Sequence, residues 1–224
     1  MNTKHNRIFL SVLLMATLVL AAVALCGCQN TTTTSGSDPS TASPATTAPA
    51  PTIDLSGNWY ADIVIKDHGT VTIKLECAIA PITCTNFIRL AQSGFYNGLT
   101  FHRIIEGFMA QGGDPEGTGY GGSEENIFGE LAATGYNNPL SHTRGTISMA
   151  RGGYDMNSAS SQFFIVHRDS AGLDGMYAAF GRVTQGMEHI DAICAAAQPV
   201  DGNGYIAPED QPVIETITVR REAV

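Results

Sequence analysis

Five short apolar runs follow one another between residues 101 and 183, and this pattern limits the fold more than any other feature of the sequence. The runs are four to six residues long, are bounded by Gly, Asp, Asn or Ser, and span residues 101–105, 108–111, 146–150, 163–166 and 178–183. Runs of this length between turn residues are typical of strands. Many short strands indicate a mainly β fold with a closed or nearly closed sheet.

The elements around these runs follow from periodicity. Residues 71–76 alternate apolar and polar side chains, which predicts a strand with one face in a core. Pro81 suits the first turn of a helix, and an amphipathic pattern continues from it to Gly94. A second helix is predicted over residues 186–197, and a closing strand over residues 212–219.

The N-terminus has the pattern of a secretion signal. Lys4 and Arg7 precede an uncharged apolar run from Ile8 to Leu25. That run also reaches the threshold length of a membrane-spanning helix, so an uncleaved anchor remains an alternative. Leu25-Cys26-Gly27-Cys28 is similar to a bacterial lipobox, although cysteine is less usual at the position of Cys26. We therefore predict a signal peptide over residues 1–27 and lipidation of Cys28, which supplies the two or more acyl chains that stable anchoring needs.

A tether and one domain are predicted after the signal peptide. From Gln29 to Pro51 the chain is rich in Thr, Ser, Ala and Pro with one charge, Asp38, so it cannot bury enough surface to fold. We assign residues 28–56 to the lipidated cysteine and a tether whose coil spans about 25 Å. Residues 57–224 have the size of one ordinary domain.

The charge of the chain excludes some partners. Removing residues 1–27 takes away two basic residues and no acidic one, so the formal charge of −9 becomes −11. Such a surface disfavours nucleic acid, because phosphate contacts need clustered Lys and Arg. We expect a monomer that is extracytoplasmic and anchored through Cys28 to a bacterial cell membrane.

Three ordered motifs resemble those of the cyclophilins. They are the stretch from Phe101 to Asp114, the block Ser161-Gln162-Phe163-Phe164-Ile165, and Leu173-Asp174-Gly175 followed by Phe180-Gly181. The resemblance runs from about Gly69 to about Val219. It implies an eight-stranded antiparallel barrel capped by two helices, and the activity of a peptidyl-prolyl cis-trans isomerase.

The reaction that the resemblance implies needs no cofactor. Rotation about an X-Pro bond is slow because amide resonance raises a barrier of about 18–20 kcal/mol, and no covalent bond is made or broken. When the amide twists, the proline nitrogen regains a lone pair. A permanent donor aimed at that nitrogen favours the transition state selectively. Arg103 is the candidate, because its guanidinium is always charged and its donors form a fixed fork.

The remaining site residues are assigned by the resemblance. Phe108, Met109, Phe164 and Leu173 match the apolar pocket for the proline ring, whereas composition alone would assign such residues to the core. Gln111 and Gln162 match two glutamines that position the arginine and the substrate backbone; a structural role at a sheet edge is the alternative. The substrate-binding set is completed by three further residues, Ala150, Arg151 and Tyr177.

Departures from the family pattern are also informative. Arg151 stands where asparagine is common in eukaryotic members, and Tyr177 takes the place of a pocket histidine of the family. Gly172 replaces a tryptophan that contacts cyclosporin, which predicts weak binding of that drug. His102 is expected to be a core histidine whose hydrogen bonds are satisfied, and no metal site is predicted.

The function predicted from the sequence is therefore isomerisation of X-Pro bonds in proline-containing unfolded or nascent secreted polypeptides. A non-catalytic module that binds proline peptides at the cell surface is the alternative. A purely structural surface lipoprotein is disfavoured, because the matched polar site residues are all present.

Overall fold

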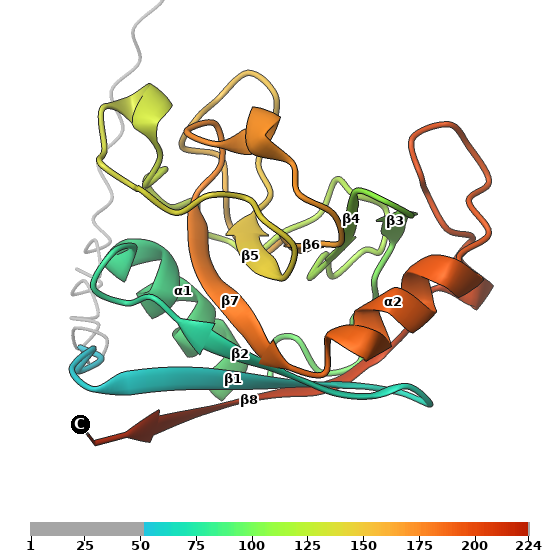
Figure 1. Ribbon diagram of the computed structural model, residues 1–224, viewed down its shortest axis with the longest axis horizontal. Helices are drawn as coiled ribbons and strands as arrows, with labels where there is room; N and C mark the ends of the chain where they lie inside the picture. The colour runs from blue at the N-terminus through green and yellow to red at the C-terminus, as the bar shows by residue number, and fades with distance from the viewer. Residues whose placement is uncertain (1–51, 224) are drawn as a thin grey trace, which may run out of the picture. The chain divides into compact units, whose positions relative to one another are not determined.

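A computed structural model describes residues 52–223 of the chain. Eight strands form one antiparallel sheet in the order β3-β4-β6-β5-β7-β2-β1-β8, and the sheet curls around a single core (Figure 1). The strands are β1 (Asn58–Ile65), β2 (Gly69–Leu75), β3 (Arg103–Ile105), β4 (Met109–Gly112), β5 (Thr146–Met149), β6 (Phe163–Val166), β7 (Ala179–Gln185) and β8 (Ile214–Glu222). This architecture confirms the mainly β fold with two helices.

The edge strands β3 and β8 approach each other through the segments that precede them. The backbone N–H of Gly98 donates to the carbonyl of Ile214 at 2.8 Å, and the N–H of Phe101 donates to the carbonyl of Pro212 at 2.9 Å. Among the described strands, β3 and β8 are not paired by a continuous ladder. These individual bonds join the two edges of the curled sheet instead.

Strand β1 was not predicted from the sequence. Every second side chain along it is buried, from Trp59 to Ile65, as expected for a strand with one face in the core. It lies between β2 and β8 and pairs with both along most of its length. Ile53 and Leu55, within the segment assigned to the tether, pack against the core.

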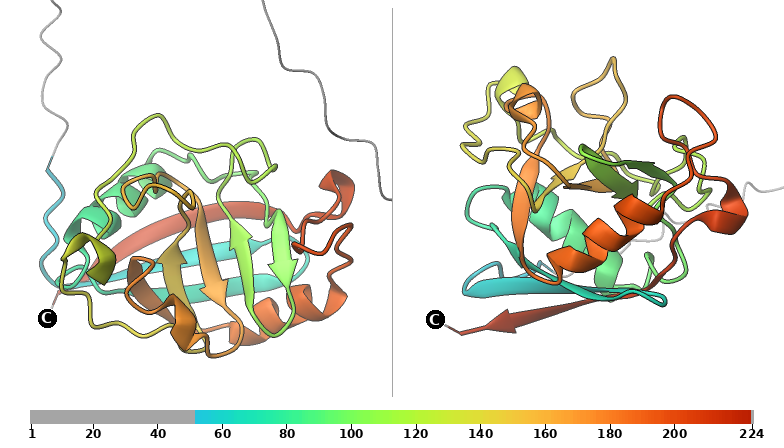
Figure 2. Two further views of the ribbon diagram at one scale, coloured as in Figure 1. Left: turned by 90° about the horizontal axis from the view of Figure 1, so that it is seen from above. Right: turned by 45° about the vertical axis from the view of Figure 1, so that its right-hand side comes forward.

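The helices lie at different ends of the curled sheet, as Figures 1 and 2 show. Helix α1 (Pro81–Gln92) has no capping side chain at Ala80. Instead, the buried carboxylate of Glu130 accepts the free N–H groups of Ile82 and Thr83 at 3.0 and 2.8 Å. Helix α2 (Met187–Ala196) follows Gly186, where φ is +81° and a Cβ would lie 2.2 Å from a β2 carbonyl. Only glycine fits there.

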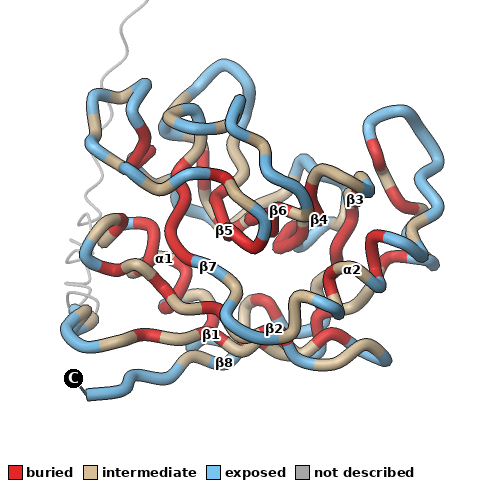
Figure 3. Tube along the Cα trace, viewed as in Figure 1, coloured by how far each residue is buried: buried red, intermediate tan, exposed pale blue. Residues whose placement is uncertain are grey.

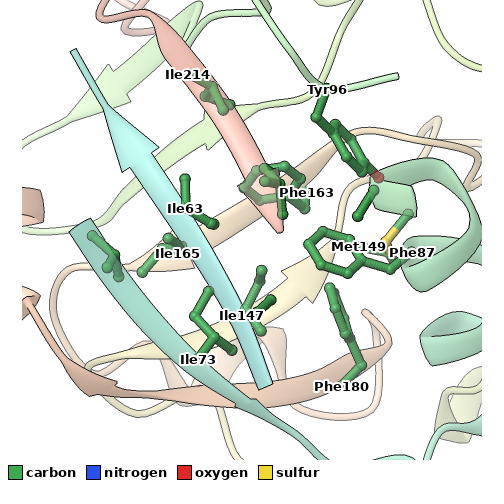
Figure 4. Packing of buried hydrophobic residues seen from close by; sticks show 14 of the residues in the cluster. Ile63, Ile73, Phe87, Tyr96, Ile147, Met149, Phe163, Ile165, Phe180 and Ile214 are labelled. Atoms are coloured by element: carbon green, nitrogen blue, oxygen red, sulfur yellow. The ribbon is translucent and has the colours of Figure 1, made fainter. Parts of the chain in front are cut away.

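The core fills the interior of the sheet and is rich in isoleucine and phenylalanine (Figure 4). The rings of Phe87, Tyr96 and Phe163 pack with centroids 5.2–5.7 Å apart. Figure 3 shows that exposed residues concentrate on the loops, whereas the strands around the core are largely buried or half-buried. Cys77, Cys84 and Cys194 are buried free thiols.

Several predictions concern residues outside the described range. The signal peptide, the lipidated Cys28 and most of the tether fall within residues 1–51. Within residues 52–223, neither helix has the length and apolar composition needed to cross a membrane.

Candidate active site

Strands β3, β4, β6 and β5 are neighbours in the sheet, as Figure 2 shows. The site lies on the face of these strands that points away from the main core. Strand register places one residue from each in a single row: Arg103, Gln111, Phe164 and Ser148. The adjacent row belongs to the core: Ile104, Ala110, Ile165 and Ile147. Because successive side chains point to opposite faces of a sheet, the same short strands build both the core and the site.

A cavity of about 700 Å³ opens over this outer face. Nine of the ten predicted site residues line it: Arg103, Phe108, Met109, Gln111, Ala150, Arg151, Phe164, Leu173 and Tyr177. The tenth, Gln162, lines an adjoining cavity of about 300 Å³ and bonds to Gln111. Residues more than 70 positions apart in the sequence therefore meet at one place.

Arg103 is held from two sides at the cavity wall. Its Nε donates to the backbone carbonyl of Asn203 at 2.7 Å, and its Nη1 donates to Oε1 of Gln111 at 3.3 Å. Burial lowers the pKa of the guanidinium, and the charges of Tyr177 and Asp201 oppose that shift. An arginine with a lowered pKa still carries its charge in a protein. The fork is thus fixed and half-buried beside an apolar surface.

The two glutamines continue this arrangement across the sheet. Nε2 of Gln111 donates to Oε1 of Gln162 at 2.8 Å, and Nε2 of Gln162 donates to the carbonyls of Gly119 and Gly121. The loop that carries those glycines is shaped by the buried Asp114, whose carboxylate accepts backbone N–H groups including that of Glu116 at 2.9 Å. Arg103 is therefore linked through side chains to the glycine-rich loop.

The apolar wall of the cavity forms a cluster separate from the core. Met109, Phe164 and Val166 are buried in it, and half-buried side chains pack around them, including Phe108, Leu173 and Tyr177. Phe164 and Tyr177 meet edge to face with ring centroids 5.6 Å apart. Phe163, the neighbour of Phe164, belongs to the core cluster as its strand parity predicts.

Comparison with known proteins identifies the family. Residues 60–220 match the family described as "Cyclophilin type peptidyl-prolyl cis-trans isomerase/CLD". The chain belongs to this family. Over 131 residues it is 47% identical to a Helicobacter pylori peptidyl-prolyl cis-trans isomerase, covering 58% of this chain and 76% of the relative. Over 125 residues it is 45% identical to the Bacillus subtilis peptidyl-prolyl cis-trans isomerase B, covering 56% and 83% respectively.

The fold of solved cyclophilins matches as well. A Cryptosporidium parvum cyclophilin-type isomerase, crystallised in the presence of the dipeptide Ala-Pro, aligns with a TM-score of 0.64 and 30% identity. The alignment covers 73% of this chain and 99% of that structure. Cyclophilin membership and the curled half-barrel of eight antiparallel strands are thus established together, and the isomerase activity is that of the family.

His142 supports the cyclophilin site and was not predicted from the sequence. Its ring is buried and stacks on the ring of Phe164, with the two centroids 5.9 Å apart. Nδ1 lies 2.9 Å from Oδ1 of Asp174, and Nε2 lies 3.0 Å from Oγ of Ser148. Since a carboxylate only accepts, we assign the proton to Nδ1 and let Ser148 donate to Nε2. Burial lowers the pKa of His142, and Asp174 opposes this effect.

Arg151 occupies the boundary between the two cavities. Its Nε donates to the carbonyl of Met176 at 3.0 Å, and its guanidinium lies 4.8 Å from the centre of the Tyr177 ring. The neighbouring Ala150 donates its backbone N–H to the carbonyl of Gln162 at 2.9 Å. A substrate chain can therefore pair with the carbonyl of Ala150 but not with its N–H.

His102 and the segment near residue 203 also border the cavity. His102 is buried as predicted, but the expectation that its hydrogen bonds are satisfied is wrong, because neither ring nitrogen has a hydrogen-bond partner among residues 52–223. No group of three His, Cys, Asp or Glu side chains in that range could hold a metal ion. Asp201, Asn203 and Tyr205 also line the cavity, and none of them was predicted as a site residue. The glycines around these residues indicate a turn, but they do not indicate that the turn lies beside Arg103.

Proposed function

We propose that this protein is a lipid-anchored, extracytoplasmic isomerase that acts on X-Pro bonds of unfolded or nascent secreted chains. The observation that carries the catalytic part is the fixed Arg103 fork beside an apolar cluster that is separate from the core. The location and the substrates are inferred from the sequence of residues 1–56.

The geometry supports catalysis by stabilising a twisted amide. The apolar cluster would hold the proline ring, while the chain preceding the ring turns about the X-Pro bond. As the amide loses planarity, the proline nitrogen regains its lone pair, and a preorganised Nη group of Arg103 can donate a hydrogen bond to it. Since the planar amide nitrogen is a poor acceptor, this hydrogen bond favours the transition state over the ground state.

The rest of the polar row would orient the substrate. Gln111 touches both Arg103 and Gln162, so it lies where the backbone of a bound peptide would cross the strands. The carbonyl of Ala150 can supply a backbone acceptor at the cavity, whereas the N–H of that residue already donates to the carbonyl of Gln162. Rotation requires no change in covalent bonding, so these contacts suffice for the reaction.

A folding role at the membrane face is supported by the chain before the domain. The lipobox-like Leu25-Cys26-Gly27-Cys28 and the polar stretch up to Pro51 would hold the domain near a membrane without fixing its orientation. Uncatalysed prolyl isomerisation takes about 10–100 s, so secreted chains that fold outside the cytoplasm gain from a catalyst there.

The rival is a module that binds proline peptides without turnover. The apolar cluster alone would serve binding, but a binder has little use for a charged fork held by both a backbone carbonyl and a glutamine. Exchange NMR on an X-Pro peptide with the purified domain separates the two, because only an enzyme speeds cis–trans exchange. Peptide binding with unchanged exchange rates would establish the binding module instead.

The anchor is tested by Cys28→Ser in the full-length protein. Without the thiol that accepts the lipid, we expect the protein to move from the membrane fraction to the soluble fraction, as detected by immunoblot after detergent partitioning. Cys26→Ser is the matched control, since it changes the neighbouring cysteine and should leave the protein in the membrane fraction. A Cys28→Ser protein that stays in the membrane at full precursor size would instead establish an uncleaved helix as the anchor.

A further inference from the structure

The connection between α2 and β8 folds back along β3 and reaches the catalytic arginine. In it, a turn over residues 201–205 runs beside β3, with a bridge between Arg103 and Tyr205. The backbone N–H of Ile104 donates to the carbonyl of Gly204 at 2.8 Å, and that of Ile206 donates to the carbonyl of His102 at 2.9 Å. We call residues 201–205 the Asn203 turn, because the carbonyl of Asn203 accepts from Nε of Arg103.

The shape of the Asn203 turn depends on one carboxylate. Oδ1 of Asp201 accepts the backbone N–H of Asn203 at 2.9 Å and that of Tyr205 at 3.0 Å. These bonds satisfy two donors on either side of Gly204, whose φ of +86° requires glycine. The hydroxyl of Tyr205 donates to the carbonyl of Gly117 at 3.0 Å, which ties the turn to the glycine-rich loop.

We propose that Asp201 is a positioning residue for catalysis: it organises the Asn203 turn so that the carbonyl of Asn203 fixes Nε of Arg103. The two Nη groups are then left to serve Gln111 and the substrate. Asp201 acts through the turn and through Arg103, not by contact with the reacting amide. This inference rests on the isomerase activity proposed above.

The physical reason lies in the flexibility of an arginine side chain. Arg103 is only half-buried, and its contact with Gln111 is a long one at 3.3 Å. The 2.7 Å bond to Asn203 is the shorter constraint, and it sets the plane of the guanidinium. A donor that is oriented before the substrate arrives loses little entropy in the transition state, whereas a displaced donor loses much of its effect.

The first experiment compares substitutions within the connection. Asp201→Ala removes the acceptor, and we expect kcat to fall about tenfold with KM unchanged, which is less than the roughly hundredfold loss that a 1 Å misplacement can produce. Asp201→Asn keeps a side-chain oxygen that can accept the same two N–H groups, so it should restore most of the rate. Glu209→Ala is the control, because it removes an exposed carboxylate from the same connection and has no described bond to the turn.

The second experiment tests whether Asp201 acts through Arg103. In an Arg103→Ala background, Asp201→Ala should cause no further loss of kcat/KM, since the group that it positions is gone. Multiplied losses in the double variant, or an Asp201→Asn enzyme as slow as Asp201→Ala, would overturn the proposal. The first result would mean an independent role, and the second would mean that the charge matters and the turn does not.

A third readout does not depend on activity. In protein labelled with ¹⁵N at arginine, the Nε–H signal of Arg103 should be protected from exchange in the wild type and unprotected in Asp201→Ala. Protection that persists in Asp201→Ala would overturn the positioning role, even if the rate falls. A folded wild-type domain without isomerase activity would overturn the proposed function, and the Nε–H signal would still decide whether Asp201 holds the turn in place.

Discussion

Arg103 combines a permanent charge with two fixed contacts, so its removal should affect the rate more than the fold. We expect Arg103→Ala to lower kcat/KM by about two to three orders of magnitude, the effect of one preorganised donor lost from a transition state. Arg103→Lys should recover little, because an ammonium group cannot replace the fork that contacts Asn203 and Gln111 together. Exchange NMR on an X-Pro peptide measures both.

The control for this prediction is Arg182→Ala on β7. Arg182 is an exposed arginine outside the cavity lining, so its loss should leave the rate unchanged. A folded Arg103→Ala protein that keeps more than half of its activity would show that another group stabilises the twisted amide.

Gly172 is a residue at which the chain departs from the pattern that the resemblance to cyclophilins implies. It lies in the 3₁₀ turn η2 (Ala171–Leu173), next to the cavity residue Leu173, and a Cβ placed on it would meet no atom within 4 Å. The first atoms of a larger side chain at residue 172 would therefore meet no steric clash. We expect cyclosporin to inhibit the wild type weakly, because the resemblance assigns a drug-contacting tryptophan to this position.

Gly172→Trp should then raise the affinity for cyclosporin about thirtyfold or more, the value of one anchor of about 2 kcal/mol. The rate on short proline peptides should change little, since they depend on Arg103 and the apolar cluster. Inhibition constants for both proteins provide the measurement. Tight inhibition of the wild type would show that a different residue, such as Tyr177, supplies the contact.

At the scale of elements, strand β6 presents neighbouring phenylalanines to opposite faces of the sheet. Phe163 is fully buried in the core, whereas Phe164 packs in the apolar cluster of the site. Phe163→Ala should lower the free energy of unfolding by about 3–5 kcal/mol. Phe164→Ala should raise KM and lower kcat/KM, because the Phe164 ring forms part of the cavity wall. The loss of stability should be smaller than for Phe163→Ala, because one side of the Phe164 ring faces the cavity and not the core.

The two substitutions serve as controls for each other, since they remove the same ring from adjacent positions. Urea unfolding and peptide kinetics on both proteins give the comparison. Equal destabilisation with unchanged KM for Phe164→Ala would place that ring in the core after all.

Periodicity predicted most elements because their local patterns agree with their final environment. The runs that became β3 to β7 were found within two residues of their observed ends, and both helices were bounded by Pro81 and by glycines. Strand β1 was missed although its alternation is as regular as that of β2. It was missed because it lies between the segment assigned to the tether and the first predicted strand.

The site was predictable where its residues belong to the sequence motifs that resemble those of the cyclophilins. Arg103, Gln111 and Phe164 belong to motifs whose order is preserved, and register then aligns them in one row. Asn203 contributes a backbone carbonyl, which carries no side-chain signature in a sequence. His142 reaches the site from a loop 22 residues before Phe164, and only the packed structure reveals its contact with that ring.

Across the whole molecule, the curled sheet separates stability from function. Its inner face holds the main core, and its outer face over β3 to β6 holds the cavity, so each strand contributes to both. Two buried histidines make the stability of the domain depend on pH. His102 precedes Arg103 and His142 stacks on Phe164, and burial lowers the pKa of each below its ordinary value of 6.5.

These histidines predict that the domain loses stability in mild acid. Between the ordinary pKa of 6.5 and the lowered folded-state values, the unfolded chain binds protons that the folded chain does not. The free energy of unfolding should therefore be at its full value above pH 6.5 and decrease as the pH falls below it. Aspartates with lowered pKa values, such as Asp114 and Asp174, lose their contribution only nearer their ordinary 3.8 and below.

Urea unfolding at pH 7.5 and pH 5.5 tests this prediction, because the two values lie on either side of the ordinary histidine pKa of 6.5. His102→Leu removes one of the two imidazoles and should reduce the pH dependence, since neither of its nitrogens bonds to another described residue. The ring signals of His102 and His142 should both titrate below pH 6.5 in NMR spectra of the folded protein. A free energy of unfolding that stays constant between the two pH values would show that both histidines take up protons in the folded protein as readily as in the unfolded chain.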